Sequence, residues 1–213
     1  DEAMQHASRK GLDLPSVTAR RMSGKPIDQI TKTDRQLGKC LGFGLAFGLG
    51  SNGLSRYAKR SYNVSINPED SKGLVKSYRE AYPQFYAWQK ERAEEGETTL
   101  LSRTVCGKVR KLDPERSYTT ALNNPVQGSA AEVLMYMLVK LQSEADSQGF
   151  ALRNTVHDEV CVSVEDSEKK ITNTKQCMEE SAVWAYRKVF GPEAIIKGLI
   201  SIGVGGNWKD AKQ

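Results

Sequence analysis

The sequence predicts an α+β fold, with helices in its first half and antiparallel hairpins between long helices in its second half. Residues 67–70, Asn-Pro-Glu-Asp, are typical of a helix start, since they supply a cap, a proline and two acids. The valines of 160–164 alternate with polar or small residues, as in a half-buried strand. Segments 100–105 and 108–112 flank a Cys106-Gly107 turn and predict a second hairpin.

Composition indicates a globular protein without a zinc site. The 213 residues are 38% hydrophobic and 27% charged, and the net charge of +5 permits a polyanionic partner without requiring one. The four cysteines lie far apart and there are only two histidines, which predicts a reduced, cytoplasmic setting. The longest apolar run, 41–49, is too short to span a bilayer, and the polar opening DEAMQHASRK is unlike a signal peptide, so we expect no membrane association.

The first 32 residues predict a short helix and a polar connection through Pro26. A capping box, formed either by Thr31 with Asp34 or by Thr33 with Gln36, then starts a second helix. That helix is rich in glycine, and each glycine costs about 1 kcal/mol relative to alanine. We therefore expect packing or a ligand to stabilise it.

Arg35, Lys39, Phe43 and Phe47 recur in this helix at a spacing of four. They share one broad face, roughly 18 Å long, with two cations followed by two rings. Cations suit phosphate oxygens and rings suit a sugar and a base, so the face fits a nucleoside triphosphate. Two alternatives stay open: an amphipathic helix with core phenylalanines, or a strand over 41–47 before the dinucleotide-type glycine pattern of 48–53.

The middle of the chain predicts a helix from Pro68 to about Ala81, a break near Pro83 and a continuation to Gly96. The hairpin that follows is strongly basic and is either solvated or phosphate-binding; its cations are Arg103, Lys108, Arg110 and Lys111.

The second half predicts a long helix that follows residues 123–128 and ends near Gly149, strands over 150–156 and 160–164, a helix over 166–190 and a last strand over 195–204. Asp158 and Glu159 lie at the tip of the hairpin between the two paired strands. Mg²⁺ binds one or two carboxylates together with substrate phosphates, so this tip is a candidate metal site. The alternative is a solvated acidic turn.

Five segments together, in this order along the chain, resemble the C-terminal part of a family A DNA polymerase. They are Asp13 with Thr18-Ala19; the face of 35–47 with Gly44, Gly48, Gly53 and Leu54; Asn123-x-Pro125-x-Gln127-Gly128; Val156-His157-Asp158-Glu159-Val160; and Asn207-Trp208. The resemblance implies a polymerase right-hand fold, with helical fingers over 1–96 and part of an antiparallel palm sheet over 97–213. The thumb and the first palm motif are expected to be absent from this chain.

For the fingers, the resemblance implies that Arg35 and Lys39 bind the incoming dNTP and that Lys39 donates a proton to pyrophosphate. Phe43 would lie by the sugar. Phe47 stands where the family usually has tyrosine, so stacking would survive without the hydroxyl.

For the palm, the resemblance implies that Asp158 and Glu159 hold Mg²⁺ as two ions, shared with a carboxylate outside this chain. It also implies that His157 lies near the primer terminus and contributes to dNTP binding. Asn123 and Gln127 would contact DNA near the nascent pair. The cations expected to bind DNA from the basic hairpin are Arg103, Lys108 and Arg110.

The resemblance therefore implies template-directed DNA synthesis by a two-metal mechanism. The expected partners are primer-template DNA, dNTP and a second polypeptide that carries the thumb and the first palm motif, in a bacterial or phage-infected cytoplasm or an organelle. One alternative is a non-catalytic subunit that binds DNA or nucleotide. A remote alternative, a dinucleotide-binding oxidoreductase, depends only on Gly48, Gly50 and Gly53.

Overall fold

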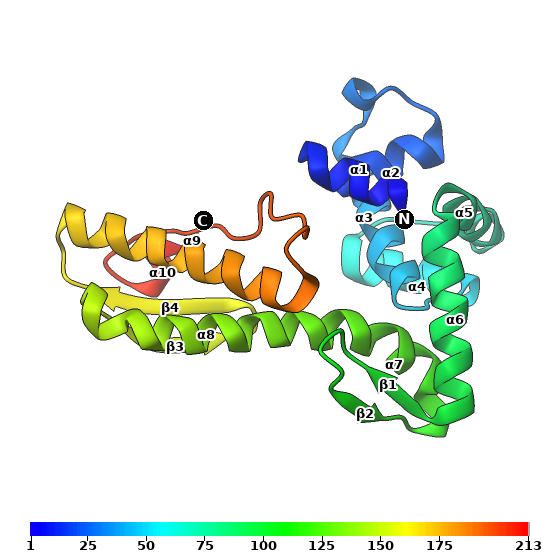
Figure 1. Cartoon of the computed structure of the whole chain (residues 1–213). Helices are drawn as coiled ribbons and strands as arrows, with labels where there is room; N and C mark the ends of the chain where they lie inside the picture. Colours follow the sequence, from blue (N-terminus) through cyan, green and yellow to red (C-terminus); the bar gives the residue numbers. More distant parts are fainter. Residues whose placement is uncertain (213) are drawn as a thin grey trace. The chain divides into compact units, whose positions relative to one another are not determined.

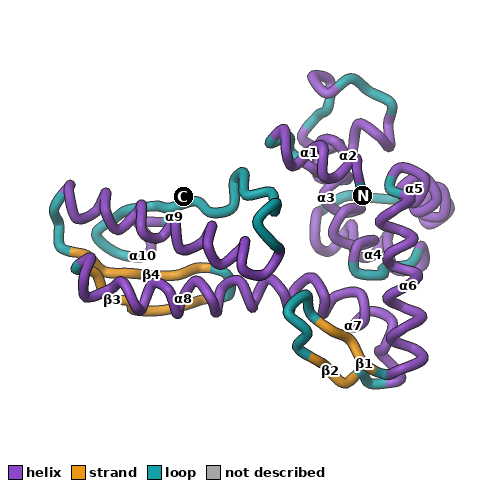
Figure 2. Tube along the Cα trace, viewed as in Figure 1, coloured by secondary structure: helices purple, strands orange, loops and turns teal. Residues whose placement is uncertain are grey.

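The computed structural model describes residues 1–212 and divides them into two compact units (Figure 1). Unit 1 contains 1–104 and 108–126, and unit 2 contains 105–107 and the residues from Gln127 onward. Helices dominate unit 1, and each unit has one two-stranded antiparallel sheet, coloured orange in Figure 2. The predicted α+β fold is confirmed. The predicted boundary between fingers and palm at residue 96 is a functional division, and it stays a prediction.

Unit 1 begins with six α-helices and a short 3₁₀ turn. They are α1 (Glu2–Lys10), α2 (Leu14–Ser23), η1 (Ile27–Gln29), α3 (Lys32–Ala46), α4 (Ser51–Tyr62), α5 (Pro68–Ala81) and α6 (Pro83–Thr99). The helix start predicted at Asn67 is confirmed, since its side chain accepts a hydrogen bond from the Glu69 amide and Pro68 is the first helical residue.

The core of unit 1 forms around α3. Leu41 and Leu45 are buried there with Leu54 of α4 and with Tyr78 and Tyr82 at the end of α5. Burial of these side chains offsets the low helix propensity of the glycines in α3. Packing therefore stabilises the glycine-rich helix, as its sequence requires.

Unit 1 ends with strands β1 (Leu101–Arg103) and β2 (Val109–Lys111), the 3₁₀ turn η2 (Pro114–Arg116) and α7 (Ser117–Asn123). A π-helical turn, η3 (Asn124–Gly128), follows α7 directly. Buried Asn124 donates a hydrogen bond to the Ser102 hydroxyl at 3.2 Å, which joins this turn to β1.

Unit 2 packs two long helices against one hairpin (Figure 1). The helices are α8 (Ser129–Gln148) and α9 (Glu168–Phe190), the strands are β3 (Phe150–Val156) and β4 (Glu159–Val164), and α10 (Trp208–Ala211) follows. Phe150, Leu141 and Met178 are buried between the helices and the hairpin. Among the helices of residues 1–212, none has the length and hydropathy needed to cross a bilayer.

The predicted end of a helix at Gly96 is wrong, because α6 continues to Thr99 and ends at Leu100, whose φ is 52°. Gly96 serves a different purpose. A Cβ at this position would lie 2.6 Å from the Cβ of Ala121, so glycine allows α7 to approach α6 closely.

The predicted strand over 195–204 is also wrong, since these residues form a loop. Leu199, Ile200 and Ile202 pack on the α8–α9 core through their side chains. A Cβ on Gly203 would lie 1.7 Å from the Ala211 carbonyl oxygen, so the backbone is pressed against α10. The structure also has helices that the sequence analysis did not predict. Residues 1–32 contain two helices, α1 and α2, where one was expected, and α4, α7 and α10 were not expected.

Candidate nucleotide, metal and DNA sites

The start of the candidate nucleotide site is fixed by a capping box at the N-terminus of α3. The Thr31 hydroxyl accepts a hydrogen bond from the Asp34 amide at 3.1 Å, and the Asp34 carboxylate accepts one from the Thr31 amide at 3.0 Å. The Thr31 alternative is therefore confirmed, because Thr33 lies inside the helix. The two bonds satisfy backbone donors that have no partner within the helix.

Helix α3 places Arg35, Lys39 and Phe43 on one face at steps of four residues. The Phe43 side chain is 49% exposed, so it is not a core residue as the amphipathic alternative required. Phe47 lies one residue beyond the helix, as its C-cap with φ −100°, and is half-buried. Within residues 1–212, no hydrogen bond or ion pair occupies the Lys39 ammonium.

Arg35 is held by Asp13, the N-cap of α2. The guanidinium donates from Nε at 2.9 Å and from Nη2 at 2.8 Å to the two carboxylate oxygens. The bond from Arg35 lowers the pKa of Asp13, so the carboxylate stays charged at neutral pH. Because a guanidinium has five N–H donors, this pair fixes Arg35 and leaves donors for a phosphate.

The alternative strand over 41–47 is wrong, because residues up to Ala46 are helical and the glycine pattern connects α3 to α4. A dinucleotide fingerprint requires a strand before the first glycine. Gly48 has φ 85°, and a Cβ there would lie 2.6 Å from the Tyr118 ring. Backbone conformation and packing against α7 explain this glycine, and the oxidoreductase alternative loses its structural basis.

The candidate metal site is the two-residue turn between β3 and β4. Val156 pairs with Glu159, so His157 and Asp158 form the turn, and both are exposed. His157 has φ 55°, a left-handed conformation that is uncommon outside glycine. No described residue contacts the Asp158 carboxylate by a hydrogen bond or ion pair, so its oxygens fit a hard cation such as Mg²⁺.

Glu159 differs from its neighbour because both of its carboxylate oxygens are engaged. The Lys212 ammonium lies 2.8 Å from Oε1, and the Trp208 indole donates to Oε2 at 3.1 Å. The bond from Lys212 is the main cause of a lowered Glu159 pKa. The described part of the chain brings together no cluster of three metal-ligating side chains. Asp158 is therefore the open carboxylate of this turn, and the role of Asp158 and Glu159 in holding metal stays a prediction.

The basic hairpin divides its cations between two faces. Ser102 pairs with Arg110 and Arg103 pairs with Val109, and paired residues project to the same side of a sheet. Arg103 and Arg110 therefore project to opposite faces, and both are exposed. Lys108 lies in the turn before β2, where its amide donates to the Thr104 hydroxyl at 3.0 Å. These three cations do not form a single phosphate-binding face.

Asn123 is the last residue of α7, and Gln127 lies in the π-helical turn η3. Both side chains are exposed. Single-turn π-bulges occur often at functional sites, where they change the direction of side chains on an otherwise regular helix.

Sequence reasoning missed the contacts that hold these candidate side chains. Asp13 is followed three residues later by Ser16, whose amide and hydroxyl it binds, so a helix cap could be predicted there. Its partner Arg35 lies 22 residues away, and Trp208 lies 49 residues from Glu159. No short-range pattern indicates either pairing.

Comparison with known proteins gives one family. The family described as DNA polymerase family A matches residues 1–210. DNA polymerase I of Aquifex aeolicus is 33% identical over 190 residues, which cover 85% of this chain and 31% of that protein. The thermostable DNA polymerase I of Thermus filiformis is 27% identical over 222 residues, covering 100% of this chain and 25% of the relative.

A solved structure is similar over the whole chain. It is described as the POL domain of Pol1 from M. smegmatis in complex with DNA primer-template and dNTP. It matches with a TM-score of 0.84 and 27% identity, covering 100% of this chain and 37% of that one. The chain thus spans well under half the length of each of these relatives.

Proposed function

Because this chain belongs to DNA polymerase family A, we propose that it takes part in template-directed DNA synthesis, the transfer of a nucleotide from dNTP to a primer 3′-hydroxyl. The observation that carries the proposal is the match of the whole chain to a domain solved with primer-template and dNTP. The proposed partners are accordingly primer-template DNA and dNTP.

In unit 1, the exposed face of α3 would bind the triphosphate. Arg35 and Lys39 would neutralise the phosphate oxygens, since fixed cations stabilise charge that develops on a transferring phosphoryl group. Lys39 has no partner to displace among the described residues, and it would protonate the leaving pyrophosphate. The exposed Phe43 ring would lie against the sugar, and Phe47 would stack near the base.

In unit 2, Asp158 would hold catalytic metal. Mg²⁺ bound there, as one of two ions, would supply positive charge to the attacking and leaving oxygens. Glu159 would assist by keeping the turn in place, because its carboxylate forms an ion pair with Lys212 and accepts a hydrogen bond from Trp208. His157 would lie near the primer terminus.

DNA would be bound by residues of both units. Asn123 and Gln127 would contact the duplex near the nascent pair, and the exposed Arg103, Lys108 and Arg110 would contact phosphates. Arg103 and Arg110 project to opposite faces of the hairpin, so only one of them would contact the phosphates of the same DNA strand.

Two-metal transfer requires a further carboxylate, which we propose comes from outside residues 1–212. Strands β3 and β4 pair only with each other within that range, so both outer edges of this hairpin are unpaired. A strand added to an open edge would complete both the sheet and the metal site. A second polypeptide would supply it, or another segment of a longer chain.

Primer extension with Mg²⁺ and four dNTPs tests the proposal, using the chain alone and together with the polypeptide segment that carries the further carboxylate. We expect synthesis only in the combined sample. Asp158→Asn should abolish it, whereas Asp166→Asn, an exposed carboxylate beyond β4, should not. Full synthesis by the chain alone would refute the need for an outside carboxylate. DNA binding without synthesis in any combination would favour a non-catalytic binding subunit.

The role of Lys39 has a matched control on the same helix. Lys39→Gln should lower kcat about 10²-fold or more, since proton transfer by a positioned group contributes about 10²–10⁴-fold. Lys32→Gln removes an equal charge from the first turn of α3 and should leave kcat unchanged. Equal effects of the two variants would contradict a direct role for Lys39.

A further inference from the structure

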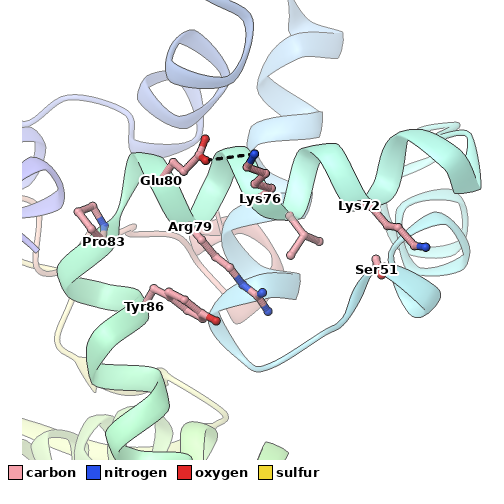
Figure 3. Close-up of a pocket in the computed structure, with 8 residues that line it drawn as sticks. Ser51, Lys72, Lys76, Arg79, Glu80, Pro83 and Tyr86 are labelled. Atoms are coloured by element: carbon pink, nitrogen blue, oxygen red, sulfur yellow. Dashed lines mark ion pairs between the residues drawn. The ribbon is translucent and has the colours of Figure 1, made fainter.

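A groove of about 630 Å³ lies along the exposed face of α9, in unit 2. The α9 residues that line it are Glu179, Glu180, Val183, Trp184, Arg187 and Lys188. Figure 3 shows a groove of unit 1 whose charged residues are three bases and one acid, Lys72, Lys76, Arg79 and Glu80. The α9 groove differs because it carries two acids and two bases. None of its residues belongs to the proposed nucleotide, metal or DNA sites.

The acids and bases occupy opposite halves of the α9 groove. Glu179 and Glu180 lie in the turn before Trp184, and Arg187 and Lys188 lie in the turn after it. The same midpoint, immediately before Trp184, separates Glu180 from Arg187 and Glu179 from Lys188. All four charged side chains are exposed, and within residues 1–212 none of them forms an ion pair. The face therefore presents four charges in an order that reverses about its centre.

Trp184 lies at the centre of this face, and its side chain is 41% exposed. Two residues of α8 contact the indole ring. The Tyr136 ring meets it edge-on with centroids 6.2 Å apart, and the Lys140 ammonium lies 5.9 Å from its centroid. These contacts hold the ring in place at the surface. Tryptophan and arginine are enriched among the residues that contribute most to protein–protein binding, and they lie near the centres of interfaces.

We propose that this face of α9 binds a second copy of the chain, with the two α9 helices antiparallel. Glu180 and Arg187 are two helical turns apart, so both lie along the middle of the face. In the antiparallel pair, Glu180 of each copy lies opposite Arg187 of the other, and the two Trp184 rings meet beside the two-fold axis. A parallel pair would instead put like charges opposite each other, so charge selects the antiparallel one. Glu179 and Lys188 add the same complementarity at the edges.

The contact is small, so we expect a weak dimer. The charged stretch from Glu179 to Lys188 extends about 14 Å along one face of one helix. Stable complexes bury about 1,200 Å² or more, and smaller contacts are transient. Salt screens exposed charges, so association should be strongest at low ionic strength. Dimerisation through α9 is independent of DNA synthesis, because it uses none of the residues proposed for that reaction.

Sedimentation equilibrium of the chain at low salt, from about 1 to 500 µM, measures this association. Glu180→Arg should weaken dimerisation about 100-fold or more, because it places like charges opposite each other at both symmetric contacts. Arg187→Glu should weaken it equally, for the same reason. A mixture of the two variants should dimerise again. One variant then carries only bases at these two positions and the other only acids, so both contacts become attractive.

The matched control is Glu80→Arg, which reverses an exposed acid on α5 and changes the net charge by the same amount. Figure 3 shows Glu80 beside Lys76, in the groove of unit 1. This control should leave dimerisation unchanged. Trp184→Ala should raise the dimer dissociation constant about 30-fold, as expected for an aromatic residue at the centre of an interface. Far-UV circular dichroism checks that each variant is folded.

A wild-type chain that stays monomeric at every concentration would overturn the proposal and leave this face to a different partner. Undiminished dimerisation of Glu180→Arg or Arg187→Glu alone would assign the association to another surface, which also overturns it. A mixture that stays monomeric would refute the pairing of Glu180 with Arg187. The proposed DNA synthesis is tested separately, because Asp158→Asn should abolish synthesis without changing dimerisation. Each hypothesis can therefore fail without the other.

Discussion

Replacing Gly38 by alanine should destabilise unit 1, although alanine is the better helix former. Gly38 is a buried residue of α3, and a Cβ there would lie 2.1 Å from the Pro15 carbonyl oxygen and 2.9 Å from the Ala19 nitrogen. Both atoms belong to the backbone of α2 and cannot rotate away. The two helices would have to separate.

The magnitude follows from two opposing terms. Helix propensity favours alanine by about 1 kcal/mol. Overpacking costs about 1–3 kcal/mol, and contact with backbone atoms puts Gly38 near the upper end. Gly38→Ala should therefore lower the free energy of unfolding of unit 1 by about 2 kcal/mol. Gly42 lies four residues further along the same helix, and a Cβ added there would have no neighbouring atom within 4 Å. Gly42→Ala should therefore stabilise unit 1 by up to about 1 kcal/mol.

Urea unfolding monitored by Trp88 fluorescence measures both variants. The chain has three tryptophans, and a Trp184→Phe/Trp208→Phe background leaves the probe in unit 1 only. The midpoints of the two alanine variants should lie on opposite sides of the background midpoint. If Gly38→Ala raises the midpoint as Gly42→Ala does, then α2 and α3 are not in backbone contact and the reasoning is refuted.

Tyr82→Phe should cost unit 1 about 1–2 kcal/mol, because the Thr18 hydroxyl, 2.9 Å from the Tyr82 hydroxyl and buried, would lose its partner. The exposed Tyr118→Phe provides the control, and an equal urea midpoint for both would contradict the prediction. Hydrogen bonds from Thr31 lower the pKa of Asp34 from 3.8 to about 2. In the folded protein this carboxylate stays charged at pH values where it is already protonated in the unfolded chain. It therefore stabilises the folded state fully above about pH 4, and this stabilisation is lost as pH falls toward 2. The midpoint difference between wild type and Asp34→Ala should shrink across that window, and a constant difference would refute the assignment.

Local sequence determined the elements that carry the candidate site. The capping box at Thr31 and the helix start at Asn67 follow from hydrogen bonds between near neighbours, so both could be predicted. Helical periodicity is a local property as well, and it put Arg35, Lys39 and Phe43 on one face. The hairpin was predicted for the same reason, since the valines of 160–164 alternate, but Glu159, which was expected at the tip, belongs to β4.

Only the tertiary structure decided which of these side chains are open to a ligand. Asp13 engages Arg35, and Lys212 engages Glu159, across separations that no sequence pattern marks. Residues 195–204 have the composition of a strand but form none, because a strand exists only where another edge pairs with it. Periodicity and capping depend on residues within about four positions, whereas pairing of charges and edges depends on where the folded backbone brings distant residues.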